Sequence, residues 1–200
     1  MTILYKVHDN LYVNLTNKCP CACTFCLRQT RDHMDDSGSL WLEREPEYEE
    51  VIKAFDNYNL DDYKEIVFCG FGEPTERIDV LLKVAGYIKK NFKKTIRINT
   101  NGLGNLVNNR DITPELKGLI DVISISLNTP NKERYYELTR SRFGIDSFDA
   151  MLDFAGKAVK YVPTVIMSTV ATTITKEEEA ECQAICDRLG VTYRIRPWED

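Results

Sequence analysis

Residues 65–75 have the sequence Glu-Ile-Val-Phe-Cys-Gly-Phe-Gly-Glu-Pro-Thr, which combines a short strand, a turn and the start of a helix. The run Glu65–Phe68 is typical of a strand buried on both faces, as in a parallel sheet. Gly70–Pro74 then breaks the pattern, and Thr75 can cap a helix whose apolar residues follow at helical spacing. This stretch therefore predicts one strand–turn–helix unit of an α/β fold.

The same unit recurs along the chain. Six main strands are predicted, at Leu11–Thr16, Glu65–Phe68, Thr95–Thr100, Val122–Leu127, Thr164–Val170 and Thr192–Arg196. Helical patterns follow them, and their start signals are Pro46, Thr75, Thr113, Thr129 and Thr175. One further run, Ile3–Val7, is expected to form a hairpin with the first main strand.

This alternation of strands and helices implies parallel units with right-handed crossovers. An eight-unit barrel usually needs about 250 residues. Six units in 200 residues therefore predict an α/β fold with a partial, laterally open (β/α)6 barrel, similar to an incomplete TIM barrel and preceded by a β-hairpin. No linker or repeat divides the chain, so we expect a single domain over residues 1–200.

The composition excludes several classes of protein. Apolar residues make up 43% and charged residues 28% of the chain, as in a soluble globular protein. No stretch approaches the roughly 18 apolar residues of a spanning helix, and residues 1–10 lack the pattern of a secretory signal. The net charge of −5 argues against a nucleic-acid partner. One basic cluster falls where a helix is expected to end, and it comprises Lys89, Lys90, Lys93, Lys94 and Arg97.

The chain has seven cysteines, and four of them lie between Cys19 and Cys26. Such an odd, clustered set favours a metal or cluster site in a reducing cytoplasm over a disulfide framework. Cys19, Cys23 and Cys26 have the spacing C-x3-C-x2-C, and three thiolates can hold a [4Fe–4S] cluster while one iron has no protein ligand. A structural zinc site is the alternative, and it needs a fourth ligand. The candidates for that ligand are Cys21, His33 and Cys69.

Polar and glycine-rich residues follow the predicted strands at their carboxyl ends. In open α/β sheets and barrels, these ends are where ligands bind. The cysteines follow the first main strand, and the later strands end in Gly70–Pro74, Asn99–Gly102, Ser124–Asn128, Ser168–Thr169 and Arg194–Trp198. The sequence therefore predicts a site on one rim of the sheet.

The cysteine loop, together with Gly-Phe-Gly-Glu-Pro after the second main strand, resembles the radical S-adenosylmethionine (SAM) superfamily. Residues 16–30, Thr-Asn-Lys-Cys-Pro-Cys-Ala-Cys-Thr-Phe-Cys-Leu-Arg-Gln-Thr, resemble more narrowly its TatD-linked branch. The resemblance implies that Cys19, Cys23 and Cys26 hold a [4Fe–4S] cluster whose fourth iron chelates the amino and carboxylate groups of SAM. It also implies that Phe25 lies beside the adenosyl part.

Further cofactor-binding positions follow from the same resemblance. Gly72, Glu73 and Pro74 match the unaltered part of the family's Gly-Gly-Glu-Pro motif, and either Gly70 or Phe71 stands at its first position. Glu73 or neighbouring carbonyls would accept hydrogen bonds from the amino group of SAM. Later positions that match cofactor contacts are Thr100, Ser126, Asn128 and Arg142. Other matches are Asn101, Arg140, Ser168, Thr169 and Ile195.

The resemblance predicts that SAM is cleaved to methionine and a 5′-deoxyadenosyl radical, which abstracts hydrogen from an unidentified substrate. It implies an external one-electron reductant of the flavodoxin or ferredoxin type and a functional link to a TatD-type hydrolase. Two alternatives lack this chemistry: an iron–sulfur electron carrier or redox sensor, and a zinc-stapled binding domain. Because one residue separates Cys21 from a cysteine on either side, we expect its side chain to point away from the other three.

Overall fold

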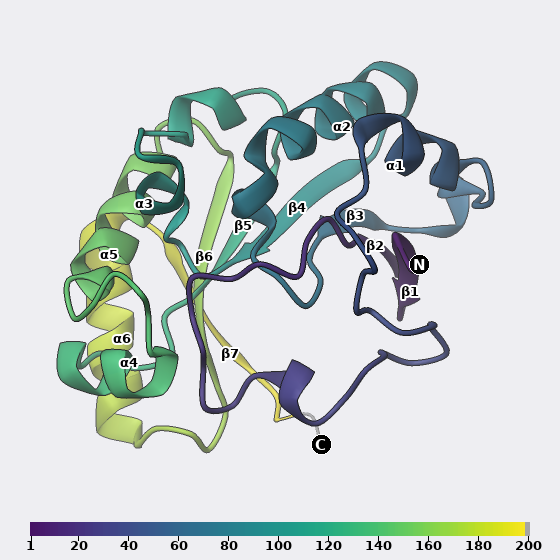
Figure 1. Ribbon diagram of the computed structural model, residues 1–200. Helices are drawn as coiled ribbons and strands as arrows, with labels where there is room; N and C mark the ends of the chain where they lie inside the picture. Colours follow the sequence, from purple (N-terminus) through teal and green to yellow (C-terminus); the bar gives the residue numbers. More distant parts are fainter. Residues whose placement is uncertain (199–200) are drawn as a thin grey trace.

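The structure is a computed structural model that describes residues 1–198. Its centre is a seven-stranded sheet in the order β1-β2-β3-β4-β5-β6-β7, with an antiparallel β1–β2 pair and parallel pairing from β2 onward (Figure 1). The strands are β1 Leu4–Val7, β2 Asn10–Val13, β3 Glu65–Phe68, β4 Thr95–Thr100, β5 Val122–Ser126, β6 Thr164–Val170 and β7 Thr192–Arg196. Because β1 and β7 remain at the two edges, the sheet does not close, which confirms the predicted partial barrel with its hairpin.

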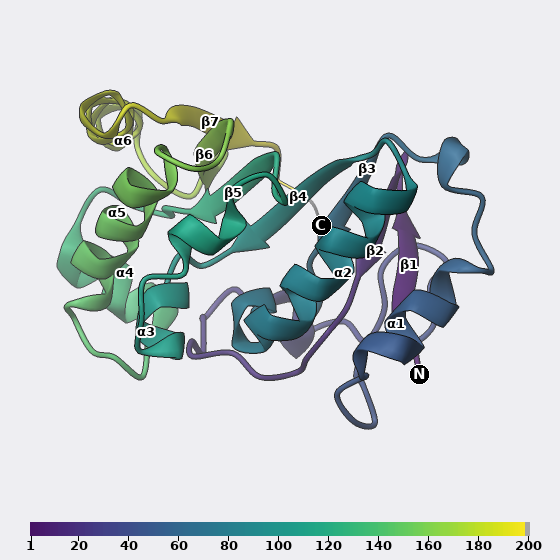
Figure 2. The same ribbon diagram turned by 90° about the horizontal axis from the view of Figure 1, so that it is seen from above.

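The α-helices lie together on one side of the sheet (Figure 2). They are α1 Tyr48–Phe55, α2 Ile78–Asn91, α3 Gly104–Asn108, α4 Lys132–Thr139, α5 Ser147–Ala158 and α6 Lys176–Leu189. Their apolar residues pack against the strands in one large core, to which the sheet contributes Ile66, Phe68, Ile98, Ile123 and Met167. Within residues 1–198, no helix has the length and apolar character that crossing a membrane requires.

Two helix starts differ from the prediction, because polar side chains compete to cap them. The Glu73 side chain accepts a hydrogen bond from the backbone N–H of Thr75 and starts a 3-10 turn, so Thr75 does not cap a helix and α2 begins at Ile78. At α4, Asn131 is the capping residue instead of Thr129. Both acceptors satisfy backbone N–H groups that the first helical turn leaves without partners.

The strand Glu65–Phe68 is buried on both faces as predicted, since Ile66, Val67 and Phe68 have no exposed surface, whereas other strands have polar residues on the face opposite the helices. In β4, Ile96 and Ile98 are almost fully buried on the helix side, and Arg97 and Asn99 alternate with them. We call the face opposite the helices the inner face. The pairing register places on it the polar residues Glu65, Arg97, Asn99, Ser124, Ser126, Ser168, Arg194 and Arg196, with Tyr12 from β2, and also the apolar Val67, Val122, Ile166 and Val170.

The predicted basic cluster is divided between two places. Lys89 is near the end of α2 and pairs with Asp121 at 2.5 Å, and Lys94 donates to the Tyr63 carbonyl oxygen at 2.9 Å. Arg97 does not belong to the helix end, because it lies within β4 on the inner face. The cluster is therefore not one continuous basic surface.

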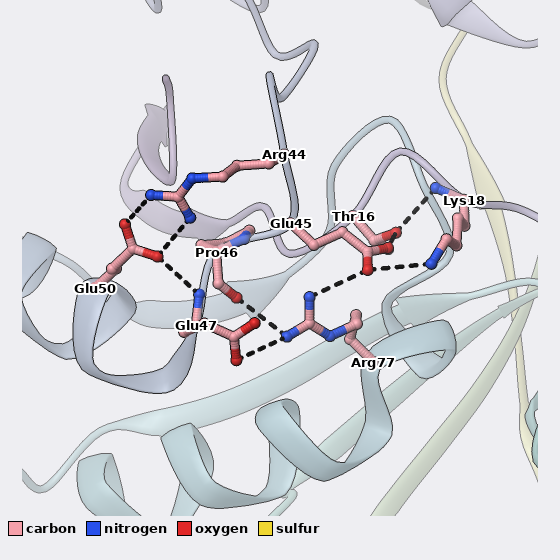
Figure 3. Close-up of polar contacts among 8 residues, drawn as sticks. All are labelled: Thr16, Lys18, Arg44, Glu45, Pro46, Glu47, Glu50 and Arg77. Carbon is pink, nitrogen blue, oxygen red and sulfur yellow. Dashed lines mark hydrogen bonds and ion pairs between the residues drawn. The ribbon is translucent and has the colours of Figure 1, made fainter.

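A long segment, residues 14–47, connects β2 to α1 and is tied down at its far end by Glu45 (Figure 3). The Glu45 carboxylate accepts hydrogen bonds from the Thr16 hydroxyl at 2.6 Å, from Lys18 Nζ at 3.1 Å and from Arg77 at 3.3 Å. Arg77 also donates to the carbonyl oxygen of Pro46 at 3.2 Å. Glu45 therefore joins the start of the cysteine loop to the residue that precedes α2.

The charge of Glu45 is favoured by these partners. Burial alone would raise the pKa of this carboxyl, but the hydrogen bonds from Thr16 and Lys18 and the charge of Arg77 lower it below its ordinary value of 4.5. A carboxyl with a lower pKa in the folded chain stabilises the fold above its unfolded pKa. That stabilisation is lost as the pH falls through the folded pKa.

We predict that Glu45→Gln lowers the free energy of unfolding by about 1–2 kcal/mol near neutral pH, because charge-assisted hydrogen bonds are lost. Denaturant unfolding of both proteins at neutral and acidic pH measures this, and the difference should vanish in acid. Glu43→Gln is the matched control, since Glu43 is exposed on the same segment. Equal losses in both variants, or a difference that persists in acid, would contradict the role of Glu45.

Candidate functional site

The cysteine loop is held in place by backbone hydrogen bonds from two directions. Ala22 N donates to Thr139 O at 2.9 Å, and Arg142 N donates to Pro20 O at 2.8 Å, so the end of α4 supports one side of the loop. On the other side, Glu73 N donates to Lys18 O at 2.8 Å. The loop is thus fixed between the ends of β3 and α4 although it has little regular structure of its own.

The four thiols of the loop have different surroundings. Cys19, Cys23 and Cys26 are partly exposed, whereas Cys21 is only 4% exposed. Hydrogen bonding with Cys21 lowers the pKa of Cys19 and of Cys23, and the same hydrogen bonds together with burial raise the pKa of Cys21. The expectation that Cys21 points away from the other thiols is therefore wrong, because its side chain hydrogen-bonds with both Cys19 and Cys23.

Arg28 is a residue of the site that sequence reasoning missed. Its guanidinium donates to three backbone carbonyl oxygens, of Asn17 at 3.4 Å, Phe71 at 3.5 Å and Cys21 at 3.3 Å. These carbonyls belong to the cysteine loop and to the turn after β3. A planar guanidinium with several donors can join separate carbonyls in this way, whereas lysine cannot. The sequence feature that could have indicated this residue is its position, two residues after the last cysteine of the loop.

The turn after β3 approaches the cysteine loop so closely that two of its residues need to be glycine. A Cβ atom at Gly72 would overlap the carbonyl oxygens of Thr16 and Lys18, and one at Gly70 would overlap the side chain of Asn14. Asn14 is fully buried and its amide donates to Leu40 O at 2.8 Å, so it cannot move aside easily. Both glycines therefore have a packing role in this turn.

Glu73 is buried, and its carboxylate joins this turn to the end of β4. Oε1 accepts hydrogen bonds from the Thr75 and Thr100 hydroxyls at 2.8 and 2.7 Å and from Thr75 N, and Oε2 accepts one from Asn101 N at 2.8 Å. Burial raises the pKa of Glu73, while these hydrogen bonds lower it in part. Oε2 has one protein donor and therefore keeps capacity to accept a second hydrogen bond.

Asn101 brings the end of β4 to the cysteines. Its side-chain amide lies 3.9 Å from Cys19 Sγ and 3.8 Å from Cys21 Sγ. The next strand contributes Ser126 at its end and Asn128 just beyond, where Asn128 takes a left-handed backbone conformation and its N–H donates to Ser168 O at 3.2 Å. The predicted positions Thr100, Ser126 and Asn128 thus follow neighbouring strands on one rim.

Other predicted positions have different surroundings. The Arg142 guanidinium pairs with Glu76 at 3.5 Å and lies 4.9 Å from the centre of the Phe143 ring. Arg140 ends α4 in a left-handed conformation with an exposed side chain. Phe25 is 48% exposed on the loop itself.

Two positions on the last strands do not join the inner face. Thr169 is fully buried and its hydroxyl is 2.6 Å from the Tyr193 hydroxyl. It pairs in the sheet with Ile195, which is exposed, while Ser168 pairs with Arg194 on the inner face. Of Ser168 and Thr169, only Ser168 therefore shares a face with the other candidate side chains.

Of the alternative zinc ligands, Cys21 lies beside Cys19 and Cys23, whereas His33 and Cys69 belong to other parts of the fold. His33 hydrogen-bonds with Asp32 at 2.5 Å in the exposed part of the long segment, and Cys69 follows β3. Across the described part of the chain, no group of three or more His, Cys, Asp or Glu side chains is already gathered around one point where a metal ion could bind.

The cysteine loop nevertheless has the donors that a [4Fe–4S] cluster requires. Three partly exposed thiols are available on a loop with fixed ends, and cysteine thiolates are the usual ligands of such a cluster. Their side chains would turn toward a common cluster. The residues present therefore fit a cluster held by Cys19, Cys23 and Cys26.

Comparisons with known proteins agree with this fit. The model of the radical SAM superfamily matches residues 13–188. Curated relatives include uncharacterized protein MJ0804 of Methanocaldococcus jannaschii, 26% identical over 157 residues, which are 78% of this chain and 46% of that protein. Molybdenum cofactor biosynthesis protein 1 of Homo sapiens is 24% identical over 95% of this chain and 28% of its own length. The chain thus spans less than half the length of these relatives.

Solved structures share the fold. SuiB of Streptococcus suis, bound to the precursor peptide SuiA, has a TM-score of 0.67 and 16% identity, over 98% of this chain and 40% of that one. Native anSMEcpe with bound AdoMet has a TM-score of 0.64 and 20% identity, over 94% and 51%. Because the family model covers most of the sheet and the cysteine loop, the chain belongs to the radical SAM superfamily, whose members use a [4Fe–4S] cluster and SAM.

Proposed function

We propose that residues 1–200 form a single radical SAM core domain that cleaves SAM reductively and uses the resulting radical on a substrate. The observation that carries the proposal is the contact between the two motifs. Asn101 lies beside Cys19 through its side chain and hydrogen-bonds with Glu73 through its backbone N–H. A cluster on the cysteines and a cofactor on the Glu73 turn would therefore be neighbours.

The chain's own residues would bind and orient the cofactors. Cys19, Cys23 and Cys26 would hold the cluster, and Arg28 fixes the carbonyls around it. When bound, the reduced cluster and SAM supply methionine and a 5′-deoxyadenosyl radical that takes a hydrogen atom from the substrate. The free acceptor capacity of Glu73 Oε2 suits the amino group of SAM, whose positive charge a buried carboxylate stabilises.

The remaining cofactor contacts follow the rim. We assign Ser126 and Asn128 to the ribose hydroxyls, Phe25 to the adenosyl part and Arg142 to the methionyl carboxylate. Arg142 would have to leave Glu76, and its exposed position permits this. Gly72 and Pro74 shape the turn, and Thr100 orients Glu73 through its 2.7 Å hydrogen bond.

Radical SAM enzymes in general need an external reductant, and a flavodoxin- or ferredoxin-like protein is our proposal for this chain. We also assign the chain to the TatD-linked branch, with a functional link to a TatD-type hydrolase, on the sequence of residues 16–30. All seven cysteines are free, which supports a reducing compartment such as the cytoplasm. The acidic net charge of −5 supports a substrate other than nucleic acid.

The proposed reaction is tested with anaerobically reconstituted protein and a strong reductant. We expect 5′-deoxyadenosine and methionine, measured by mass spectrometry, and none from a Cys19→Ala variant. An electron carrier would contain a reducible cluster without cleaving SAM, and a zinc domain would be colourless. A fully loaded, reducible cluster that yields no 5′-deoxyadenosine, with or without cell extract, would overturn the proposal.

The ligand assignment predicts different outcomes for four cysteine variants. Cys19→Ala, Cys23→Ala and Cys26→Ala should each lose the cluster, because a [4Fe–4S] cluster here has only three protein ligands. Cys21→Ala should retain it, because Cys21 is buried and lies outside the C-x3-C-x2-C spacing of the three ligands. Iron content and electron paramagnetic resonance measure both. The assignment fails if the Cys21 variant loses its cluster while one of the others keeps a normal spectrum.

For Glu73 we predict weaker SAM binding with an intact cluster. Glu73→Gln keeps the size of the side chain but removes the charge, so loss of one charge-assisted hydrogen bond should cost about 1.5–3 kcal/mol of binding. Calorimetric titration of SAM into the reconstituted variant measures this. Glu115→Gln, which changes a carboxylate paired with Arg110 far along the chain, is the control. Unchanged affinity in the Glu73 variant would show that its role is confined to the protein's own hydrogen bonds.

A further inference from the structure

The inner face carries three arginines and one carboxylate among the described strand residues. Arg97 belongs to β4 and Arg194 and Arg196 to β7, while Glu65 of β3 is the acid. The whole chain has a net charge of −5, so this face has the opposite sign to the rest of the molecule. A local excess of positive charge in an acidic protein concentrates anions at that place.

Two of these three arginines have no ion-pair partner among residues 1–198. Arg97 is 13% exposed and pairs with Glu65 at 3.2 Å. Arg194 and Arg196 are half-buried and have no ion pair with any residue in 1–198. Among the residues that the structure describes, the buried Nε atoms of all three have no hydrogen-bond acceptor. Leaving such donors unpaired destabilises a fold, which is why unsatisfied groups call for an explanation such as a ligand.

The charges of Arg97 and Arg196 influence the pKa values of shared neighbours. Burial, followed by the charges of Arg97 and Arg196, lowers the pKa of Arg194. The charges of Arg97 and Arg196 also oppose the effect of burial on the pKa of Cys69, at the carboxyl end of β3. The pairing register places the side chains of all three arginines on the same face of the sheet, Arg97 on β4 and the other two on β7.

This region adjoins the cysteine loop. Arg97 precedes Thr100, the last residue of β4, by three residues, which is about 10 Å along a strand. Asn101 follows and lies beside Cys19 Sγ. Arg194 is the sheet neighbour of Ser168, which is the neighbour of Ser126 on the rim. A small molecule held by the arginines would therefore extend toward the cluster.

We infer that the inner face binds a small substrate through a dianionic oxygen group, a phosphate or a pair of carboxylates, held by Arg97, Arg194 and Arg196. This inference rests on the proposed function, because it names the class of substrate for the same site. Guanidinium groups bind phosphate and carboxylate oxygens in pairs of hydrogen bonds. Three arginines and one glutamate leave a charge of +2 for the ligand to balance.

Binding of two probes to the reconstituted protein, saturated with SAM and held at constant ionic strength, tests the inference. Inorganic pyrophosphate represents the phosphate source and succinate the dicarboxylate source. We expect at least one to bind, by calorimetry, and Arg194→Gln and Arg196→Gln each to weaken it about tenfold or more. Arg188→Gln, an exposed residue on α6, is the matched control and should not change it. The probe that binds identifies the source.

A variant that is expected to strengthen probe binding, instead of weakening it, makes the test more specific. Glu65→Gln removes the acid that competes for Arg97 and should tighten binding of the same probe, by up to about fivefold. If the arginine variants fold poorly, phenylglyoxal labelling of the wild type, read by peptide mass spectrometry, replaces them. Labelling of Arg194 and Arg196 should fall when the probe is present, and labelling of Arg188 should not.

The inference is overturned if neither probe binds, or if the arginine variants bind the probe as tightly as the wild type. It is also overturned if those variants lose affinity for SAM while probe binding is unchanged, since the arginines would then serve the methionyl carboxylate. SAM cleavage, measured on the same samples, separates the two proposals. If the probe binds in an arginine-dependent way but no 5′-deoxyadenosine is formed, the proposed cleavage of SAM is refuted. If 5′-deoxyadenosine is formed but neither probe binds, the proposed anion site is refuted.

Discussion

The site depends on the close approach of two turns at Gly72. The turns follow β2 and β3, which are adjacent strands and therefore only about 4.8 Å apart. The carbonyl oxygens of Thr16 and Lys18 occupy the space where any other residue at position 72 would place its Cβ atom. With glycine there, Glu73 N reaches Lys18 O at 2.8 Å, and the cysteine loop becomes attached to the second strand of the barrel.

Glu73 extends this attachment to a third strand. Its backbone binds the loop after β2, and its carboxylate binds Thr100 and Asn101 at the end of β4. Burial of a carboxylate destabilises a fold unless hydrogen-bond donors replace its lost hydration. Here the hydroxyls and backbone N–H groups do so. The same donors would be left unpaired without Glu73, so three strand ends keep their relative positions through one residue.

Much of this arrangement could be predicted from the sequence, where the signals are local. The bounds of β3, β4, β6 and β7 agree with the predicted runs, because β-branched segments there are flanked by clear breakers. The capping box of Thr175 and Glu178 is also present. The cysteine spacing and the Gly-Glu-Pro turn predict a site at one rim of the sheet, because the carboxyl ends of parallel strands lie at the same edge.

The features that were missed depend on residues far apart in the chain. Arg28 binds the carbonyl of Phe71, and no sequence pattern relates these two positions. Thr75 and Glu73 are both good capping residues, and only the tertiary position of Glu73 decides between them. Arg97 was grouped with nearby lysines because they are neighbours in sequence, although strand alternation separates it from them.

The polarity of the inner face has a cause beyond exposure to water. In the described part of the chain, no α-helix covers this face (Figure 2), yet Val67, Ser124 and Ser168 on it are buried, so exposure to water does not explain its charged residues. Serine and asparagine, which the face also contains, would be enough for contact with water, and so would a mixture of positive and negative charges. Three arginines that repel one another, in a chain with more acidic than basic residues, are not explained by solubility. Like charges on one face of the sheet reduce stability, and an anionic ligand such as the one proposed above would offset their repulsion.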